Sequence, residues 1–301
     1  MMKIAWDPVY AHPLPEGHRF PMLKYELIPE QLLHEGTITR ENIFSPEKVE
    51  EKYILLSHDE NYWQKLKKLT LDYQQVRRIG FPLSAQLVNR EITIVQGTID
   101  TTLYAMEYGV SLNCAGGTHH AGRNFGEGFC LLNDIAIASN YLLWHNLKKR
   151  IAIVDLDVHQ GNGTADILQG NKNIFTFSMH GEKNFPLQKI KSSLDIPLHD
   201  NTGDETYLSI LSDCLQLIKK QFDPDFVFFQ SGVDILDTDK LGRLSVSKEG
   251  CKERDKIVFE FCKKNNIPLA VCMGGGYSEK IKDIVDAHCN TFRLASSIFF
   301  Y

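Results

Sequence analysis

The chain has 301 residues, of which 43% are hydrophobic and 24% charged, and a formal net charge of −5. This length accommodates a large hydrophobic core, and the composition is that of an ordinary globular enzyme. The acidic balance lacks the basic excess that nucleic-acid-binding proteins normally carry, so we expect no direct nucleic-acid binding.

The cysteines and the N-terminus bear on where the protein works. The seven cysteines are odd in number and form no CxxC pair. Several lie in apolar stretches, as reduced core cysteines do, so we expect a cytoplasmic location. We find no apolar signal region at the N-terminus and no apolar run long enough to cross a membrane. The sequence leaves the oligomeric state open.

The N-terminal third is predicted to be mainly helical. Residues 3–6 are a short strand candidate, and a loop rich in proline and histidine follows at 8–20. Ser45 followed by Pro46 is a favourable helix start, and residues 77–83 predict a loop. Helical spacing of apolar residues is present at 22–33, 59–69 and 85–108.

From residue 110 onward, short apolar runs alternate with helical patterns. Strands are expected at residues 110–114, 151–155, 173–178, 226–230 and 268–273. Helices are expected at residues 131–146, 164–169, 204–220, 247–264 and 278–294. This alternation predicts an α/β fold with three layers, in which helices cover both faces of a central, mainly parallel sheet. Because no linker, repeat or low-complexity segment interrupts the chain, we expect one domain over residues 1–301.

The most informative stretch is IAIVDLDVHQGNG at residues 151–163. Its four apolar residues are typical of a buried parallel strand, and Asp155, Asp157 and His159 follow at alternate positions. Side chains at alternate positions project from one side of a strand, and buried carboxylates need a positive partner. They could be ordinary loop residues, but parallel sheets bind ligands at this end of their strands. Asp oxygen and His nitrogen are zinc ligands, so the stretch predicts a divalent-metal site.

Three other strand-end loops carry polar side chains suited to an active site. His119 and His120 lie in a glycine-rich loop, and paired histidines can transfer protons near neutral pH. Asp234 could complete a metal site of two carboxylates and one imidazole with a position open to water. Tyr277 follows three glycines, which let the backbone bend and bring the phenol inward. Each feature alone could be a surface loop or a turn, but their occurrence at successive strand ends favours one shared site.

Together these motifs resemble the zinc-dependent histone deacetylase family, which has the arginase/deacetylase fold. The matching stretches are GGTHH at 116–120, GFCLLND at 128–134, DLDVHQGNG at 155–163, SGVD at 231–234 and GGGY at 274–277. The resemblance extends from His12 and GHRFP at 17–21 to the last helix, so it covers nearly the whole chain. The HQGNG form and the compact size are most similar to the class IV branch and to bacterial histone deacetylase-like amidohydrolases.

The resemblance implies a role for each matching catalytic residue. His120 would be the general base and then the acid, with His119 contributing charge beside it. Tyr277 would hydrogen-bond the amide carbonyl as it becomes an oxyanion. Asn162 stands where class I enzymes have Asp, and it would accept a hydrogen bond from His120. A single zinc ion would be held by Asp157, His159 and Asp234.

The same resemblance implies a second cation and a substrate channel. Asp155 would orient His119 and also bind a potassium ion, together with Ser178, Met179 and main-chain oxygens near the zinc ligands. Phe129 and Phe185 would wall a narrow tunnel that takes an acyl-lysine side chain. The substrate-binding residues would be Gly128, Phe129, Phe185 and Gly275.

The leading prediction is therefore a metal-dependent amide hydrolase that removes acyl groups from lysine in proteins or peptides. A small acylated amine, such as an acetylpolyamine, remains an alternative substrate, and the acyl chain length stays open. Fe²⁺ could occupy the metal site as readily as zinc. Leu236, where binuclear arginases carry a second aspartate, and the tyrosine at 277 disfavour ureohydrolase chemistry. A non-catalytic module that binds acylated ligands is disfavoured because no ligand or catalytic residue is missing.

Overall fold

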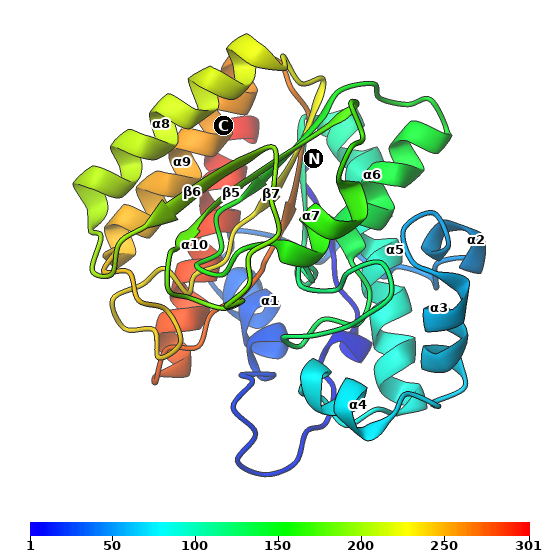
Figure 1. Ribbon diagram of the computed structural model, residues 1–301. Coiled ribbons are helices and arrows are strands. Elements are labelled where there is room, and N and C mark those ends of the chain that lie inside the picture. Colours follow the sequence, from blue (N-terminus) through cyan, green and yellow to red (C-terminus); the bar gives the residue numbers. More distant parts are fainter.

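An eight-stranded sheet forms the centre of the computed structural model, which describes all 301 residues (Figure 1). Its strand order is β2-β1-β3-β8-β7-β4-β5-β6, and every neighbouring pair is parallel. The α/β fold with a parallel central sheet is thus confirmed. The strands are β1 (Lys3–Ala5), β2 (Ile43–Phe44), β3 (Val110–Asn113), β4 (Ile151–Asp155), β5 (Ile174–Gly181), β6 (Leu194–Leu198), β7 (Phe226–Gln230) and β8 (Leu269–Cys272).

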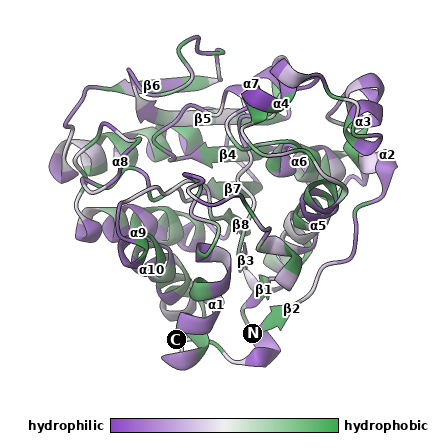
Figure 2. Ribbon diagram, turned by 90° about the horizontal axis from the view of Figure 1, so that it is seen from below, coloured by the Kyte–Doolittle hydropathy of each residue, from purple (hydrophilic) through white to green (hydrophobic).

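Helices cover both faces of the sheet and complete the three layers (Figure 2). The helices α1, α8, α9 and α10 lie on one face, and α5, α6 and α7 lie on the other, with the short helices α2 and α3 outside α5 and α6. Their bounds are α1 (Lys24–His34), α2 (Glu51–Ile54), α3 (Glu60–Lys67), α4 (Tyr73–Ile79), α5 (Ala85–Tyr108), α6 (Asp134–Trp144), α7 (Asn162–Leu168), α8 (Asp204–Gln221), α9 (Lys248–Lys264) and α10 (Ile281–Phe300). Short 3₁₀ helices occupy Pro8–Tyr10 and Arg40–Asn42.

The register of the central strands brings four strand ends to one level. Asp155 of β4 lies opposite Gln230 of β7. Gln230 lies opposite Cys272 of β8, and Cys272 lies opposite Asn113 of β3. All residues of these four strands are buried, because parallel strands covered on both faces need continuous apolar runs such as IAIVD and FVFFQ. The loops that follow the four strands therefore leave the sheet side by side.

Two expectations for the N-terminal third are wrong. No helix begins at Ser45, because helix α2 starts only at Glu51, and the Ser45 hydroxyl donates to the carboxylate of Asp7. The predicted loop at 77–83 also overlaps helix α4, which Asp72 caps at its N-terminus and which ends at Gly80 with a left-handed φ of 87°. At Ser45 the hydroxyl could have capped a helix locally, but it forms the hydrogen bond to Asp7 instead, so no helix starts there.

The strand β6 was not predicted at all. Its sequence, LDIPL, contains a charge and a proline and is only partly buried. Such residues are tolerated because β6 is an edge strand, where one side of the backbone needs no partner. The seven cysteines are buried and unpaired, as expected for core residues. None of the helices combines the length and apolar character that crossing a membrane requires.

Candidate active site

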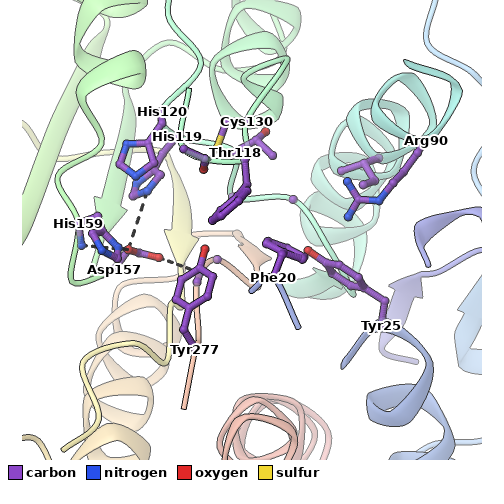
Figure 3. A pocket seen from close by; sticks show the side chains of 17 residues that line it. Phe20, Tyr25, Arg90, Thr118, His119, His120, Cys130, Asp157, His159 and Tyr277 are labelled. Carbon is purple, nitrogen blue, oxygen red and sulfur yellow. Dashed lines mark hydrogen bonds and ion pairs between the residues drawn. The ribbon is translucent and has the colours of Figure 1, made fainter. Parts of the chain in front are cut away.

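The four level strand ends deliver the polar residues singled out in the sequence to one pocket. His119 and His120 come from the loop after β3, Asp157 and His159 from the loop after β4, and Tyr277 from the loop after β8. Figure 3 shows these five side chains facing one another on one side of the pocket. Asp234, from the loop after β7, joins Asp157 and His159.

Asp157, His159 and Asp234 form a compact, buried set of candidate metal ligands. One ligand atom of each lies within 4.8 Å of the others. Nδ1 of His159 is 3.1 Å from Oδ1 of Asp157 and 3.1 Å from Oδ2 of Asp234. The remaining carboxylate oxygens are aimed by main-chain donors, since Gly275 N donates to Asp157 Oδ2 and Val158 N donates to Asp234 Oδ1. Two buried carboxylates and an imidazole are a donor set that suits a divalent cation such as zinc.

The carboxylates of Asp157 and Asp234 lie close together in a buried site, so a cation bound between them would be favourable. Burial and the neighbouring Asp157 carboxylate raise the pKa of Asp234 to about 7. Burial opposes the charged form of His159, but hydrogen bonds to the two carboxylates raise the pKa of His159 to about 10. No lysine or arginine forms an ion pair with either carboxylate. A divalent cation would relieve this repulsion, so the residues present fit a metal.

A side chain at Gly275 would destroy this arrangement. A Cβ there would collide with the carboxylates of both Asp157 and Asp234. The glycine lets the loop after β8 pass directly over these two carboxylates and donate its N–H to Asp157. Lys24, which the sequence reading missed, helps to hold this loop, because its buried ammonium donates to the Gly274 carbonyl at 3.0 Å. Burial lowers the pKa of Lys24 to about 8.

The two adjacent histidines have different electrostatic environments. Their ring centroids are 4.1 Å apart. Nδ1 of His119 lies 2.7 Å from Asp155 Oδ2; burial opposes the imidazolium, but the Asp155 carboxylate outweighs it and raises the pKa of His119. Burial and the neighbouring His119 hold the pKa of His120 well below its ordinary value. Paired groups with pKa values pushed apart are typical of acid–base sites.

His120 is held by a chain of contacts that the sequence reading found only in part. The expected contact is present, since Nδ1 of His120 lies 2.7 Å from Oδ1 of Asn162. Asn162 Nδ2 also donates to Glu127 Oε1 at 2.5 Å, and Arg78 Nε donates to Glu127 Oε2 at 2.5 Å. The available signal for Glu127 was a lone carboxylate among the glycines that precede Phe129.

Tyr277 stands across the pocket from the histidines. Its ring centroid is 6.1 Å from Phe129, 6.1 Å from Phe20 and 6.3 Å from His159. Burial raises the pKa of the Tyr277 phenol well above its ordinary value, so the hydroxyl keeps its proton and can donate it in a hydrogen bond. The backbone N–H of Tyr277 donates to Asp239 Oδ2 at 2.6 Å, and this hydrogen bond holds the Tyr277 main chain in place.

A wider cavity of about 470 Å³ leads from the surface to the same residues. Its lining includes Gly128, Phe129 and Phe185 together with His120, His159 and Tyr277. Phe185 is 41% exposed and stands perpendicular to the His120 ring at 4.9 Å, whereas Phe129 is 8% exposed. A smaller cavity of about 40 Å³ reaches from Asp157 and His159 toward Phe20, Tyr25 and Arg90 (Figure 3).

The residues expected at a potassium ion are also close together. Asp155 lies opposite Ser178 in the pairing of β4 with β5, and Met179 follows in β5. All three residues are buried. Ser178 Oγ lies 3.0 Å from Nδ1 of His180. The potassium ion itself stays a prediction.

Comparison with known proteins agrees with this geometry. The model of the histone deacetylase domain matches residues 18–292. An uncharacterized protein of Picosynechococcus sp. is 43% identical over 98% of this chain and 99% of its own length. Histone deacetylase 2 of Arabidopsis thaliana is 29% identical over 89% of this chain and 72% of its own length. Human histone deacetylase 1 is 27% identical over 94% of this chain, which spans 61% of that longer protein.

Solved structures share the fold. A histone deacetylase homologue crystallised with SAHA superimposes with a TM-score of 0.85 at 22% identity, over 98% of this chain and 84% of its own. The homologue from Aquifex aeolicus gives a TM-score of 0.83 at 21% identity, with the same coverage. The arginase/deacetylase fold and the strand-end site thus define an amide hydrolase. The chain belongs to the histone deacetylase family, which is zinc-dependent in general.

Proposed function

We propose that this enzyme is a zinc-dependent deacylase that hydrolyses the amide of acyl-lysine in proteins or peptides. The observation that carries the proposal is that His159, the buried His120 and Tyr277 line one cavity, and that Asp157 and Asp234 lie beside His159 as a candidate ligand set. An amide is a poor electrophile, so its hydrolysis needs a polarised carbonyl, a nucleophile and a proton for the leaving amine. The ligand set, His120 and Tyr277 can supply all of them.

The residues divide the chemistry among themselves. Asp157, His159 and Asp234 would hold the zinc ion, which when bound would supply Lewis acidity and lower the pKa of water at the site. His120 takes the proton of the attacking water at Nε2 and later gives it to the leaving amine. Tyr277 donates a hydrogen bond to the carbonyl oxygen as negative charge develops there.

The remaining assignments concern the environment of this centre. His119 and Asp155 form a buried hydrogen-bonded pair that places positive charge beside His120. Asp155, Ser178 and Met179 are proposed to bind a potassium ion near this pair. The HQGNG form supports a class IV-like placement, and the buried, unpaired cysteines support a cytoplasmic location. One continuous hydrophobic core supports a single catalytic domain over residues 1–301.

The walls of the wider cavity suit a slender aliphatic chain. Phe129 and Phe185 line it. A side chain at Gly128 would collide with the His120 ring, so the glycine keeps the space beside that ring open. An acyl-lysine side chain, with four methylenes between backbone and amide, would place its amide near His120 and Tyr277. The aromatic walls would bury these methylenes, which is favourable by about 0.8 kcal/mol for each methylene fully buried.

The mouth of the cavity favours a peptide over a polyamine. Its lining includes four exposed cationic side chains: Arg19, Arg78, Lys183 and Arg243. Only two carboxylates pair with them, Glu127 with Arg78, and Asp200 with both Lys183 and Arg243. The excess of positive charge would repel the ammonium groups of an acetylated polyamine, whereas a peptide can be neutral or acidic.

A substrate panel tests the proposal. Protein stripped of metal and reloaded with one equivalent of Zn²⁺ or Fe²⁺ would be assayed with acetyl-lysine peptides, longer acyl-lysine peptides and N-acetylspermidine. We expect turnover of acyl-lysine peptides only with metal, and weak or no turnover of the polyamine. Efficient hydrolysis of the polyamine with no turnover of any peptide would overturn the proposed substrate class.

A further inference from the structure

Glu127 has no role in the reaction as described so far, yet it lies at the centre of a buried chain of hydrogen bonds that ends on His120. We propose that Glu127 is a positioning residue that fixes which ring nitrogen of His120 carries the proton. This inference rests on the proposed function, because it concerns the general base of that reaction. It adds a residue that acts through Asn162 and never touches substrate.

The geometry joins four side chains from different parts of the sequence. His120 Nδ1 lies 2.7 Å from Asn162 Oδ1, and Asn162 Nδ2 lies 2.5 Å from Glu127 Oε1. Arg78 Nε lies 2.5 Å from the other oxygen, Glu127 Oε2. His120, Asn162 and Glu127 are 5%, 3% and 6% exposed, so water does not compete for the two contacts that join them, whereas the Arg78 side chain at the outer end of the chain is 51% exposed.

The direction of each hydrogen bond follows from the chemistry at the Glu127 end. An ionised carboxylate can only accept, so the amide of Asn162 must turn its NH₂ group toward Glu127. Its carbonyl oxygen then faces His120 and accepts, which requires a proton on Nδ1 of His120. In the neutral ring, Nε2 is left without a proton and is free to act as a base.

Without Glu127 this choice would be open. A side-chain amide has a donor end and an acceptor end of nearly equal size, and rotation by 180° exchanges them. If the NH₂ group of Asn162 faced His120, Nδ1 would have to accept and the proton would move to Nε2. That tautomer cannot take a proton from water at Nε2. An aspartate in place of Asn162 would accept from His120 directly; with asparagine, a second acceptor is needed to orient the amide.

Arg78 gives the carboxylate its counter-charge and a fixed position. The main chain ties the end of helix α4 to the loop that carries Glu127, because Gly128 N donates to Arg78 O and Phe129 N donates to Ile79 O. The guanidinium of Arg78 also lies over the Phe125 ring at 4.3 Å. The ion pair therefore connects two segments that are already held together, and a purely structural tie is the alternative role for Glu127.

A cycle of variants separates the two roles. In Glu127→Gln the acceptor-only group is lost, and either orientation of Asn162 becomes possible. In Asn162→Asp two carboxylates would face each other. In the double variant, an aspartate at 162 accepts from His120 and a glutamine at 127 donates to that aspartate, so the original direction returns. A matched control is Glu260→Gln, an exposed acid on α9 without an ion-pair partner.

We expect Glu127→Gln to lower kcat by about tenfold or more, the usual cost of removing a group that orients a catalytic residue. Asn162→Asp should also lower kcat, because its new carboxylate would face that of Glu127 and the repulsion would disturb the contact with His120. The double variant should return to within about threefold of the parent, and KM should change little. A second readout is the His120 tautomer, from ¹⁵N shifts of the ring nitrogens in histidine-labelled zinc-loaded protein. The proton should be on Nδ1 in the parent and the double variant, and distributed over both nitrogens in Glu127→Gln.

Two results would overturn the inference. The first is Glu127→Gln with near-parent kcat and an unchanged tautomer. The second is a double variant at least as impaired as the worse single variant, which a merely structural tie predicts. If the parent hydrolyses no acyl-lysine peptide, the proposed function fails. The tautomer measurement still decides whether Glu127 sets the His120 proton, because it needs no turnover.

Discussion

Replacing Tyr277 with phenylalanine should remove one hydroxyl and little else. The ring contacts with Phe129, Phe20 and His159 involve only the aromatic carbons and would remain. The metal ligands should also be unaffected, because Asp157 and Asp234 are oriented by the main chain of Gly275 and Val158. Metal content and stability should therefore stay at the parent level.

The expected effect is on kcat. Burial keeps the Tyr277 phenol protonated, so in the parent it can be the donor that the proposed mechanism assigns to the carbonyl oxygen of the substrate. Loss of one oxyanion donor costs about 3–4 kcal/mol, which corresponds to a fall in kcat of about 10²–10³-fold. The ground-state carbonyl uses the donor less, so KM should change much less than kcat.

The assay compares Tyr277→Phe with Tyr73→Phe, a tyrosine that is 79% exposed on α4. Steady-state kinetics would use an unactivated acetyl-lysine peptide and a trifluoroacetyl-lysine peptide, since an activated carbonyl should need the tyrosine less. Near-parent kcat on the unactivated peptide, in metal-replete Tyr277→Phe, would remove the phenol from the mechanism.

The remaining predictions address the metal, the channel and stability. Chelation should abolish activity, and one equivalent of a divalent metal should restore it; a requirement for two equivalents of manganese would contradict the single site. Phe185→Ala should lower kcat/KM for acyl-lysine peptides with little loss of stability, because Phe185 is 41% exposed. Phe129→Ala should lower kcat/KM and also destabilise the fold by about 3–5 kcal/mol, because Phe129 is buried. Unchanged kcat/KM in both variants would rule out the channel. His58 is buried with Nδ1 at Gly122 O and Nε2 accepting from Asn133 N, and burial lowers its pKa from 6.5 to about 4. Because the unfolded chain binds this proton first, stability should fall by about 3 kcal/mol as pH drops from about 6.5 to 4. Urea unfolding at several pH values should show that slope in the parent and a shallower one in His58→Gln; equal slopes would refute it.

Strand and helix patterns of strong local origin were readable from the sequence. Helix α5 matched the predicted range because Ser84 caps its N-terminus and Gly109 ends it. Strand β7 matched because FVFFQ is a continuous apolar run. Ser45 misled the prediction because its hydroxyl bonds Asp7, which is 38 residues away in the sequence. Strand β6 was invisible because an edge strand needs no apolar run.

In the candidate site, too, features that follow from the strand pattern were predictable and tertiary contacts were not. The meeting of His120, Asp157 and Asp234 could be predicted, because parallel strand ends share one edge of a sheet. The contact between Glu127 and Asn162 could not, since it joins a loop to the first residue of helix α7, 35 residues away in the sequence. Local periodicity carries no information about such a contact. The roles of the individual site residues remain predictions for the variants described above.

The most direct test of the central claim is the fate of water oxygen in the reaction. Zinc-loaded enzyme would hydrolyse an acetyl-lysine peptide in ¹⁸O-enriched water, and mass spectrometry would follow the released acetate and the peptide over time. The account predicts acetate that carries one ¹⁸O atom, formed in step with free lysine side chains and absent when the metal is removed. Unlabelled acetate, an acylated enzyme, or no turnover by protein with metal bound would contradict it.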